Sequence, residues 1–181
     1  MELEKLLQQS GEYKPMSPGG YNLSLVYGYG EEIAKLVNWS PDLDINELIK
    51  RNGGTIHYID YAVFRRYPDI FQNSIYVRSE KNFDIILPAY AGMVENRFTL
   101  AHELGHYVLH SKTSPMSYAC RNGDTPVEKE ADCFALGFMM PSDKFREACE
   151  KYKTLFELSL VFRVPELAVK ARALSLAIDL T

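Results

Sequence analysis

The sequence predicts an α+β fold in which a small sheet lies between helical segments. Apolar residues follow helical spacing up to about residue 52, give way to short β-branched and aromatic segments, and return to helical spacing from about residue 96. With 181 residues, the chain is long enough to bury a core of its own. We expect a single domain over 1–181, with a helix and connector over about 1–20 and a helical tail over about 142–181 packed on the domain.

The first part of the chain is expected to be helical. Residues 1–20 end in KPMSPGG, a Pro/Gly-rich connector that follows an N-terminal helix. EEIAKLVNW, from Glu31, and DINELIKRNGG, from Asp44, have the apolar spacing of helices. Gly53 and Gly54 provide a stop signal for the second of them.

Three strands are expected next. They are TIHYIDY from Thr55, SIYVRS from Ser74 and FDIILP from Phe83. Each is rich in β-branched and aromatic residues and is bounded by turn-forming residues, as strands are. We therefore predict a small sheet from these segments.

The rest of the chain returns to helical spacing. One helix is expected from about Asn96 to His110, followed by a polar loop, SKTSPMSYACRNGD. A second helix should run from about Pro126 to Met140, where the following proline stops it. The tail is helical again, with a break near Pro165.

Charge and cysteine content exclude several classes of protein. The net charge of −4 argues against nucleic-acid binding, which needs a basic face. No apolar run is long enough to span a bilayer, and MELEKLLQQSGEYK lacks the basic and then apolar order of a secretory signal. The three cysteines lack paired spacing and are expected to be reduced thiols. We therefore expect a cytoplasmic protein that binds neither membrane nor nucleic acid directly.

The segment AHELGHYVLH contains the pattern HExxH. On a helix, His102 and His106 lie one turn apart on the same face, so both can bind one Zn²⁺ ion. Glu103, next to the first histidine, can then take a proton from a water molecule. HExxH also occurs in helices without zinc, so the alternative of an ordinary surface helix stays open.

A third protein ligand is expected from the second helix. At about 100° per residue, Glu128 falls inside the apolar arc of that helix, whereas Glu130 falls outside it. Glu128 is therefore the candidate ligand, and Asp132, one turn on, can orient a ligand histidine. The alternative is a capping box, in which Glu128 turns back toward Thr125 at the start of the helix.

His110 and Tyr118 are further candidates with less support. His110 lies about 12 Å of helical rise from His102, so one ion cannot easily bind all three histidines. We expect His110 to interact with the last carbonyls of its helix instead. Tyr118 is either a donor to a tetrahedral oxyanion or an ordinary loop residue.

Two segments resemble the ImmA/IrrE family of metallopeptidases. They are NRFTLAHELGHYVLH and VEKEADCFALGFMMP. The second matches the family signature through Glu128, Ala131, Asp132, Phe134, Ala135, Met140 and Pro141. The resemblance implies a zincin-like fold and a gluzincin-like site, with one zinc ion bound by His102, His106 and Glu128 and with Glu103 as catalytic base. Members of the family act on helix-turn-helix repressors and so relieve the repression of mobile elements or stress genes.

Three functional hypotheses follow. The first is a zinc-dependent endopeptidase of narrow specificity that cleaves a helix-turn-helix type transcriptional repressor or a similar regulatory partner. The second is a metal-stabilised binding protein that sequesters such a partner without cutting it; the intact Glu103 favours the enzyme, since a structural zinc needs no base. The third is a DNA-binding regulator, which the end of the tail argues against, because from Leu155 onward only Arg163, Lys170 and Arg172 are basic.

Overall fold

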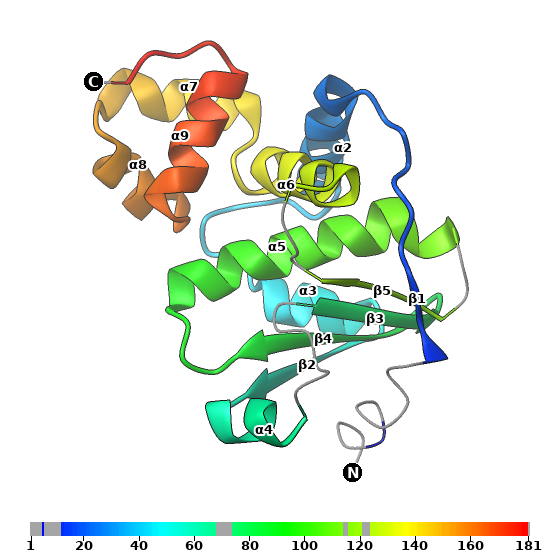
Figure 1. Ribbon diagram of the computed structural model, residues 1–181. Helices are drawn as coiled ribbons and strands as arrows, with labels where there is room; N and C mark the ends of the chain where they lie inside the picture. The colour runs from blue at the N-terminus through cyan, green and yellow to red at the C-terminus, as the bar shows by residue number, and fades with distance from the viewer. Residues whose placement is uncertain (1–4, 6–11, 68–73, 114–115, 121–123, 181) are drawn as a thin grey trace.

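The computed structural model describes residues 5, 12–67, 74–113, 116–120 and 124–180. Its arrangement confirms the predicted α+β class, with one sheet and helices on it (Figure 1). The N-terminal helix and connector were expected over about 1–20, and residues 1–4 and 6–11 of this range lie outside the described residues.

Five strands within the described ranges form one sheet, in the order β1-β5-β3-β4-β2. The predicted strands are confirmed as β2 (Gly54–Ile59), β3 (Ser74–Ser79) and β4 (Asn82–Pro88). β2 is parallel to β4, and β3 is antiparallel to both β4 and β5. Sequence analysis missed β1 (Lys14–Pro15), which is parallel to β5, and β5 (Ser117–Cys120), because both are very short and lie in segments with loop composition.

The predicted helices are confirmed with shifted boundaries. α2 (Leu23–Leu36) begins before Glu31 because the Asn22 side chain accepts a hydrogen bond from Ser24 N at 3.0 Å and caps the helix there. α3 spans Ile45–Arg51, and the two long predicted helices are α5 (Met93–His110) and α6 (Pro126–Met139). The remaining helical elements are α4 (Tyr61–Arg66), which was not predicted, the 3₁₀ turn η2 (Ser111–Thr113), α7 (Ser142–Lys151), α8 (Leu155–Phe162) and α9 (Glu166–Ser175).

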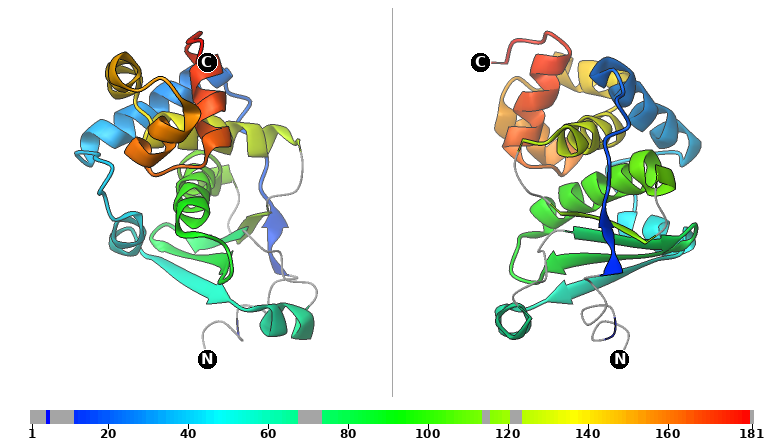
Figure 2. Two further views of the ribbon diagram at one scale, coloured as in Figure 1. Left: turned by 90° about the vertical axis from the view of Figure 1, so that its left-hand side faces the viewer. Right: turned by 45° about the vertical axis from the view of Figure 1, so that its right-hand side comes forward.

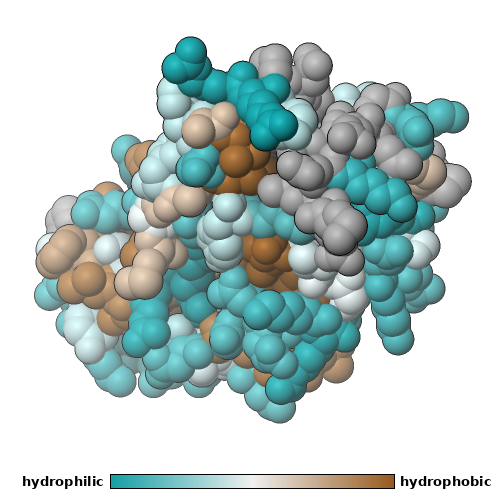
Figure 3. Space-filling model, turned by 90° about the horizontal axis from the view of Figure 1, so that it is seen from below, coloured by the Kyte–Doolittle hydropathy of each residue, from teal (hydrophilic) through white to brown (hydrophobic). Residues whose placement is uncertain are grey.

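The elements stack in layers, as the two views in Figure 2 show. α5 lies across one face of the sheet, with α2 and α6 above it and the tail helices beyond them. The main core fills this side of the sheet and includes Phe83, Ile85 and Leu87 of β4. A smaller apolar cluster around Tyr76 and Ile86 lies on the other face. Figure 3, seen from that side, shows a mainly hydrophilic surface with apolar atoms near its centre.

Two glycines hold α6 close to α2. A Cβ on Gly30 would lie 2.3 Å from the carbonyl oxygen of Phe134, and one on Gly137 would lie 2.1 Å from that of Tyr27. Real Cβ atoms do not approach backbone oxygens so closely, so the two helices pack with their backbones in contact only because both positions are glycine. This contact fixes α6, which carries the acidic candidates of the site.

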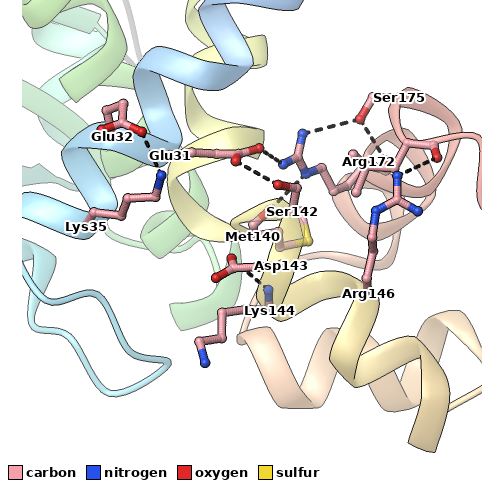
Figure 4. A network of polar contacts seen from close by, with 11 residues as sticks. Glu31, Glu32, Lys35, Met140, Ser142, Asp143, Lys144, Arg146, Arg172 and Ser175 are labelled. Atoms are coloured by element: carbon pink, nitrogen blue, oxygen red, sulfur yellow. Dashed lines mark hydrogen bonds and ion pairs between the residues drawn. The ribbon is translucent and has the colours of Figure 1, made fainter.

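The tail is joined to the rest of the described chain by a polar network, drawn in Figure 4. Arg172 of α9 is 1% exposed, donates to the carbonyl oxygen of Met140 at 2.8 Å and forms an ion pair with Glu31 of α2. Glu31 also accepts a hydrogen bond from the Ser142 hydroxyl at 2.8 Å. A buried, paired Arg172 cannot contact phosphate, so the tail has even fewer basic residues for DNA binding than the sequence suggested.

Candidate metal centre

α5 brings the two histidines of HExxH together inside the protein. His102 and His106 are 0% exposed, and their Nε2 atoms lie 3.0 Å apart. The one-turn spacing of the two residues produces this convergence, because side chains four residues apart project from the same face of a helix.

α6 adds Glu128 to this pair. Its Oε1 lies 3.2 Å from Nε2 of His106 and its Oε2 lies 3.2 Å from Nε2 of His102. One ligand atom from each of the three residues lies within 4.8 Å of the others, which makes them a group able to hold a metal ion. Although close to His102, the buried Oε2 has no hydrogen bond of acceptable geometry within the described chain. Two imidazoles and one carboxylate, one oxygen of which is buried without a hydrogen bond, fit the ligand set of a catalytic zinc ion.

Gly105, between the two histidines, allows α6 to approach. A Cβ at this position would lie 3.1 Å from the carbonyl oxygen of Ala131, tighter than ordinary contact. Glycine therefore lets the backbones of α5 and α6 come close enough for Glu128 to reach both histidines. The pattern HExxH does not itself require glycine at this position, so the sequence alone does not indicate this role.

Asp132 lies behind the first histidine, where the sequence placed it. Its Oδ1 is 2.7 Å from Nδ1 of His102, and its side chain is 46% exposed. A carboxylate accepts, so Nδ1 of His102 carries a hydrogen toward Asp132, and Nε2 is the ring nitrogen that can bind a metal once its own proton is displaced. The contact orients the ring so that Nε2 faces Glu128 and His106.

The charges of the cluster favour one positive charge between the Nε2 atoms of His102 and His106 and the carboxylate of Glu128. Burial lowers the pKa of His102, but the hydrogen bond to Asp132 and the contact with the Glu128 carboxylate outweigh it and raise that pKa to about 9. Burial raises the pKa of Glu128, but its close contacts with the two histidines prevail and lower it to about 2. Burial lowers the pKa of His106 to about 4, so this ring is neutral. An ionised carboxylate and a neutral imidazole are the forms that bind a cation.

Glu103 is fully buried directly after His102 on α5. Its charge helps to raise the pKa of His102, so the carboxylate lies within electrostatic reach of the cluster. The structure therefore places the candidate base in the same buried region as the candidate ligands.

Two expectations about this region are wrong. Glu130 is not outside the buried sector of α6 but is 2% exposed, because the connector before α2 covers that side of the helix. His110 is 0% exposed, and its ring contacts side chains: Nε2 is 2.8 Å from Oε2 of Glu130, and Nδ1 is 3.2 Å from Nδ1 of His106. A helical wheel with one apolar arc cannot detect burial on two sides.

A cavity of about 260 Å³ lies beside Glu128, between β1, β5 and the start of α6. Tyr118, on β5, lines it together with Met16 and Val127. Tyr118 stacks on Tyr76 with ring centroids 5.9 Å apart. A larger cavity of about 540 Å³ is lined by Tyr58 and Arg97 but by none of the candidate ligands, so we do not assign it to this site.

Two histidines one turn apart, a carboxylate from a second helix and an adjacent glutamate define the class of a metallopeptidase. Residues 54–174 match the peptidase M78 family, described as the IrrE N-terminal-like domain. The match covers more than half of the chain, so the protein belongs to this family, and the resemblance to ImmA/IrrE metallopeptidases is confirmed. No match to a curated protein was found. Among the described residues, no helix is long and apolar enough to cross a membrane.

Proposed function

We propose that the protein is a zinc-dependent endopeptidase of narrow specificity. The observation that carries the proposal is the convergence of His102, His106 and Glu128 in a buried cluster, beside the equally buried Glu103. Family membership supports peptide hydrolysis as the reaction. The donor set of two imidazoles and one carboxylate supports zinc as the metal, at one ion per chain.

Each residue of the cluster has a distinct task in this proposal. His102, His106 and Glu128 hold the zinc ion, which when bound polarises a carbonyl and makes water acidic enough to react near neutral pH. Glu103 accepts the proton of the attacking water and delivers it to the leaving amine. Asp132 keeps the ring of His102 oriented through its contact at 2.7 Å.

The substrate is proposed to be a helix-turn-helix type repressor or a similar regulatory partner in the cytoplasm, cut at one or a few bonds. The resemblance to the ImmA/IrrE family supports this class of substrate. The burial of the cluster supports narrow specificity, because Glu128 is 5% exposed and an unselected peptide has little access to it. We expect an extended segment of the partner to enter through the cavity beside Glu128.

The proposal is tested first by measuring the zinc content of the protein and by replacing the proposed base, Glu103. Elemental analysis of gently purified protein should find near-stoichiometric zinc, and His102→Ala should lose most of it. Glu103→Gln should keep the fold and the zinc, bind the partner, and lose cleavage by roughly 10²–10⁴-fold. Capture with Glu103→Gln as a trap, followed by mass spectrometry, identifies the partner, and wild-type protein should then cut the captured protein at defined bonds.

A reporter for repression separates the enzyme from a binding protein. Wild type should relieve repression, and Glu103→Gln should not. Equal relief by both would show that the protein works by sequestering its partner, and the endopeptidase assignment would fail. Casein, as a generic substrate, should be cut weakly by wild type.

A further inference from the structure

A chain of buried polar contacts leads from the N-terminal connector to the metal centre. The backbone N–H groups of Gly19 and Tyr21 donate to the two carboxylate oxygens of Glu130, at 2.8 Å and 3.0 Å. Gly20 between them has φ +68°, a backbone conformation that suits glycine and lets both N–H groups face one carboxylate. Figure 1 shows this connector rising from β1 past the end of α5 toward α2.

Glu130 then contacts His110, and His110 contacts His106. Oε2 of Glu130 lies 2.8 Å from Nε2 of His110, and Nδ1 of His110 lies 3.2 Å from Nδ1 of His106. Both rings are 0% exposed and Glu130 is 2% exposed. The second distance joins two ring nitrogens, so one of them must carry the hydrogen and the other must accept it.

The positions of the hydrogens follow from the chemistry of the groups. The Glu130 carboxylate is an acceptor, so Nε2 of His110 carries the N–H. A neutral imidazole has one N–H, so Nδ1 of His110 accepts. Nδ1 of His106 must then donate, which leaves a lone pair on Nε2 of His106. That nitrogen is the one that lies 3.2 Å from Glu128 and 3.0 Å from Nε2 of His102.

The two histidines among the candidate ligands therefore receive the same support by different routes. Nδ1 of His102 contacts the carboxylate of Asp132 directly, at 2.7 Å. Nδ1 of His106 reaches a carboxylate only through a second imidazole, that of His110. In both cases the far nitrogen is held as an N–H, so that the near nitrogen presents its lone pair.

We propose that His110 and Glu130 are positioning residues of the metal centre, which set the tautomer and orientation of His106 while the connector holds Glu130 in place. The inference rests on the proposed function, since it takes His106 as a ligand. Groups that hydrogen-bond to the far side of a metal ligand typically contribute 10–100-fold to metal affinity. We expect a loss of roughly this size when the series of contacts from Glu130 through His110 to His106 is interrupted.

Two substitutions at His110 separate positioning from simple packing. In His110→Asn, the amide oxygen can occupy the place of Nδ1 and accept from His106, so affinity for Zn²⁺ should stay close to wild type. In His110→Ala no acceptor remains, so affinity should fall by about 10–100-fold. Affinity is measured by competition with a chromophoric chelator, starting from metal-free protein.

His57→Ala is a matched control. His57 is 12% exposed in its side chain and pairs with Asp84 at 2.6 Å, so the variant also loses a partly buried contact between histidine and carboxylate. This pair belongs to β2 and β4 of the sheet and is separate from α6. Its loss should lower stability and leave the affinity for Zn²⁺ unchanged.

A second readout does not involve metal. In metal-free protein with ¹⁵N-labelled histidine, NMR should show His106 as the tautomer with N–H at Nδ1, in wild type and in His110→Asn. A wild-type spectrum with N–H at Nε2 of His106 would overturn the proposal even if His110→Ala did not fold. Wild-type affinity in folded His110→Ala would overturn it as well. If wild type bound no zinc, the proposed function would fail. The tautomer of His106 in the NMR spectrum would then be the remaining test of whether His110 and Glu130 position its ring.

Discussion

The chain contains the pattern Thr-x-x-Glu at two helix starts, and the two glutamates behave differently. At α8, Thr154 and Glu157 form a complete capping box: Thr154 Oγ1 accepts from Glu157 N at 3.2 Å, and Glu157 Oε2 accepts from Thr154 N at 3.1 Å. At α6, Thr125 also caps the helix, with Glu128 N 3.4 Å from its Oγ1. The carboxylate of Glu128, however, faces the two histidines of α5.

The surroundings of the two helix starts explain the difference. Glu157 stands at an exposed helix end, where its own backbone offers the best hydrogen-bond donors. Glu128 faces α5, where two imidazoles offer a stronger interaction with its charge. A local pattern therefore predicts where a helix begins, while a partner on another helix decides where the carboxylate points.

Removing the two glutamates one at a time should give the largest difference between the two helix starts. Glu128→Ala takes away one of three proposed ligands, so the protein should lose nearly all of its zinc. Glu157→Ala should keep zinc at the wild-type level and lower the melting temperature slightly, because it removes only half of a cap. Elemental analysis and thermal unfolding measure both effects.

The opposite pattern would restore the capping alternative. A Glu128→Ala protein that holds zinc fully and is only mildly destabilised would show that its carboxylate serves the helix start and not a metal.

Moving α6 away from α5 should have the next largest effect. In Gly105→Ala the new methyl would lie 3.1 Å from the carbonyl oxygen of Ala131, so α6 must shift by a few tenths of an ångström. Overpacking of this kind costs about 1–3 kcal/mol, against about 1 kcal/mol gained in helix propensity. We expect weaker zinc binding and a lower free energy of unfolding, measured by chelator competition and urea titration.

Gly28 of α2 provides the control for this change. A Cβ there would meet nothing within 4 Å, so Gly28→Ala should stabilise the protein by about 0.5–1 kcal/mol and leave zinc binding unchanged. Zinc affinity in Gly105→Ala equal to that of Gly28→Ala would mean that the approach of the two helices does not set the geometry of the site.

Features marked by residues close together in the sequence could be predicted, whereas features that depend on contacts between distant parts of the chain could not. HExxH, the segments of β2 to β4 and the start of α6 are each marked by a pattern of residues within a few positions of one another, so they could be predicted from the sequence. β1 pairs with β5 about a hundred residues further along the chain, and nothing in Lys14–Pro15 itself indicates a strand. Glu130 and Gly19 are likewise 111 residues apart, so the burial of Glu130 was invisible to a helical wheel.

The smallest expected effect concerns the two threonines. An N-cap threonine contributes about 0.5–2 kcal/mol to the free energy of unfolding. Thr154 takes part in both halves of its capping box, so Thr154→Ala should cost about 1 kcal/mol. The hydrogen bond at Thr125 is long, at 3.4 Å, so Thr125→Ala should cost about 0.5 kcal/mol.

Both variants are measured by urea unfolding of metal-free protein, because bound zinc would add its own binding free energy to stability. Zinc content, measured separately, should stay at the wild-type level in both. A loss of zinc in Thr125→Ala alone would mean that the cap holds Glu128 in place, so that helix start and metal centre act as one unit.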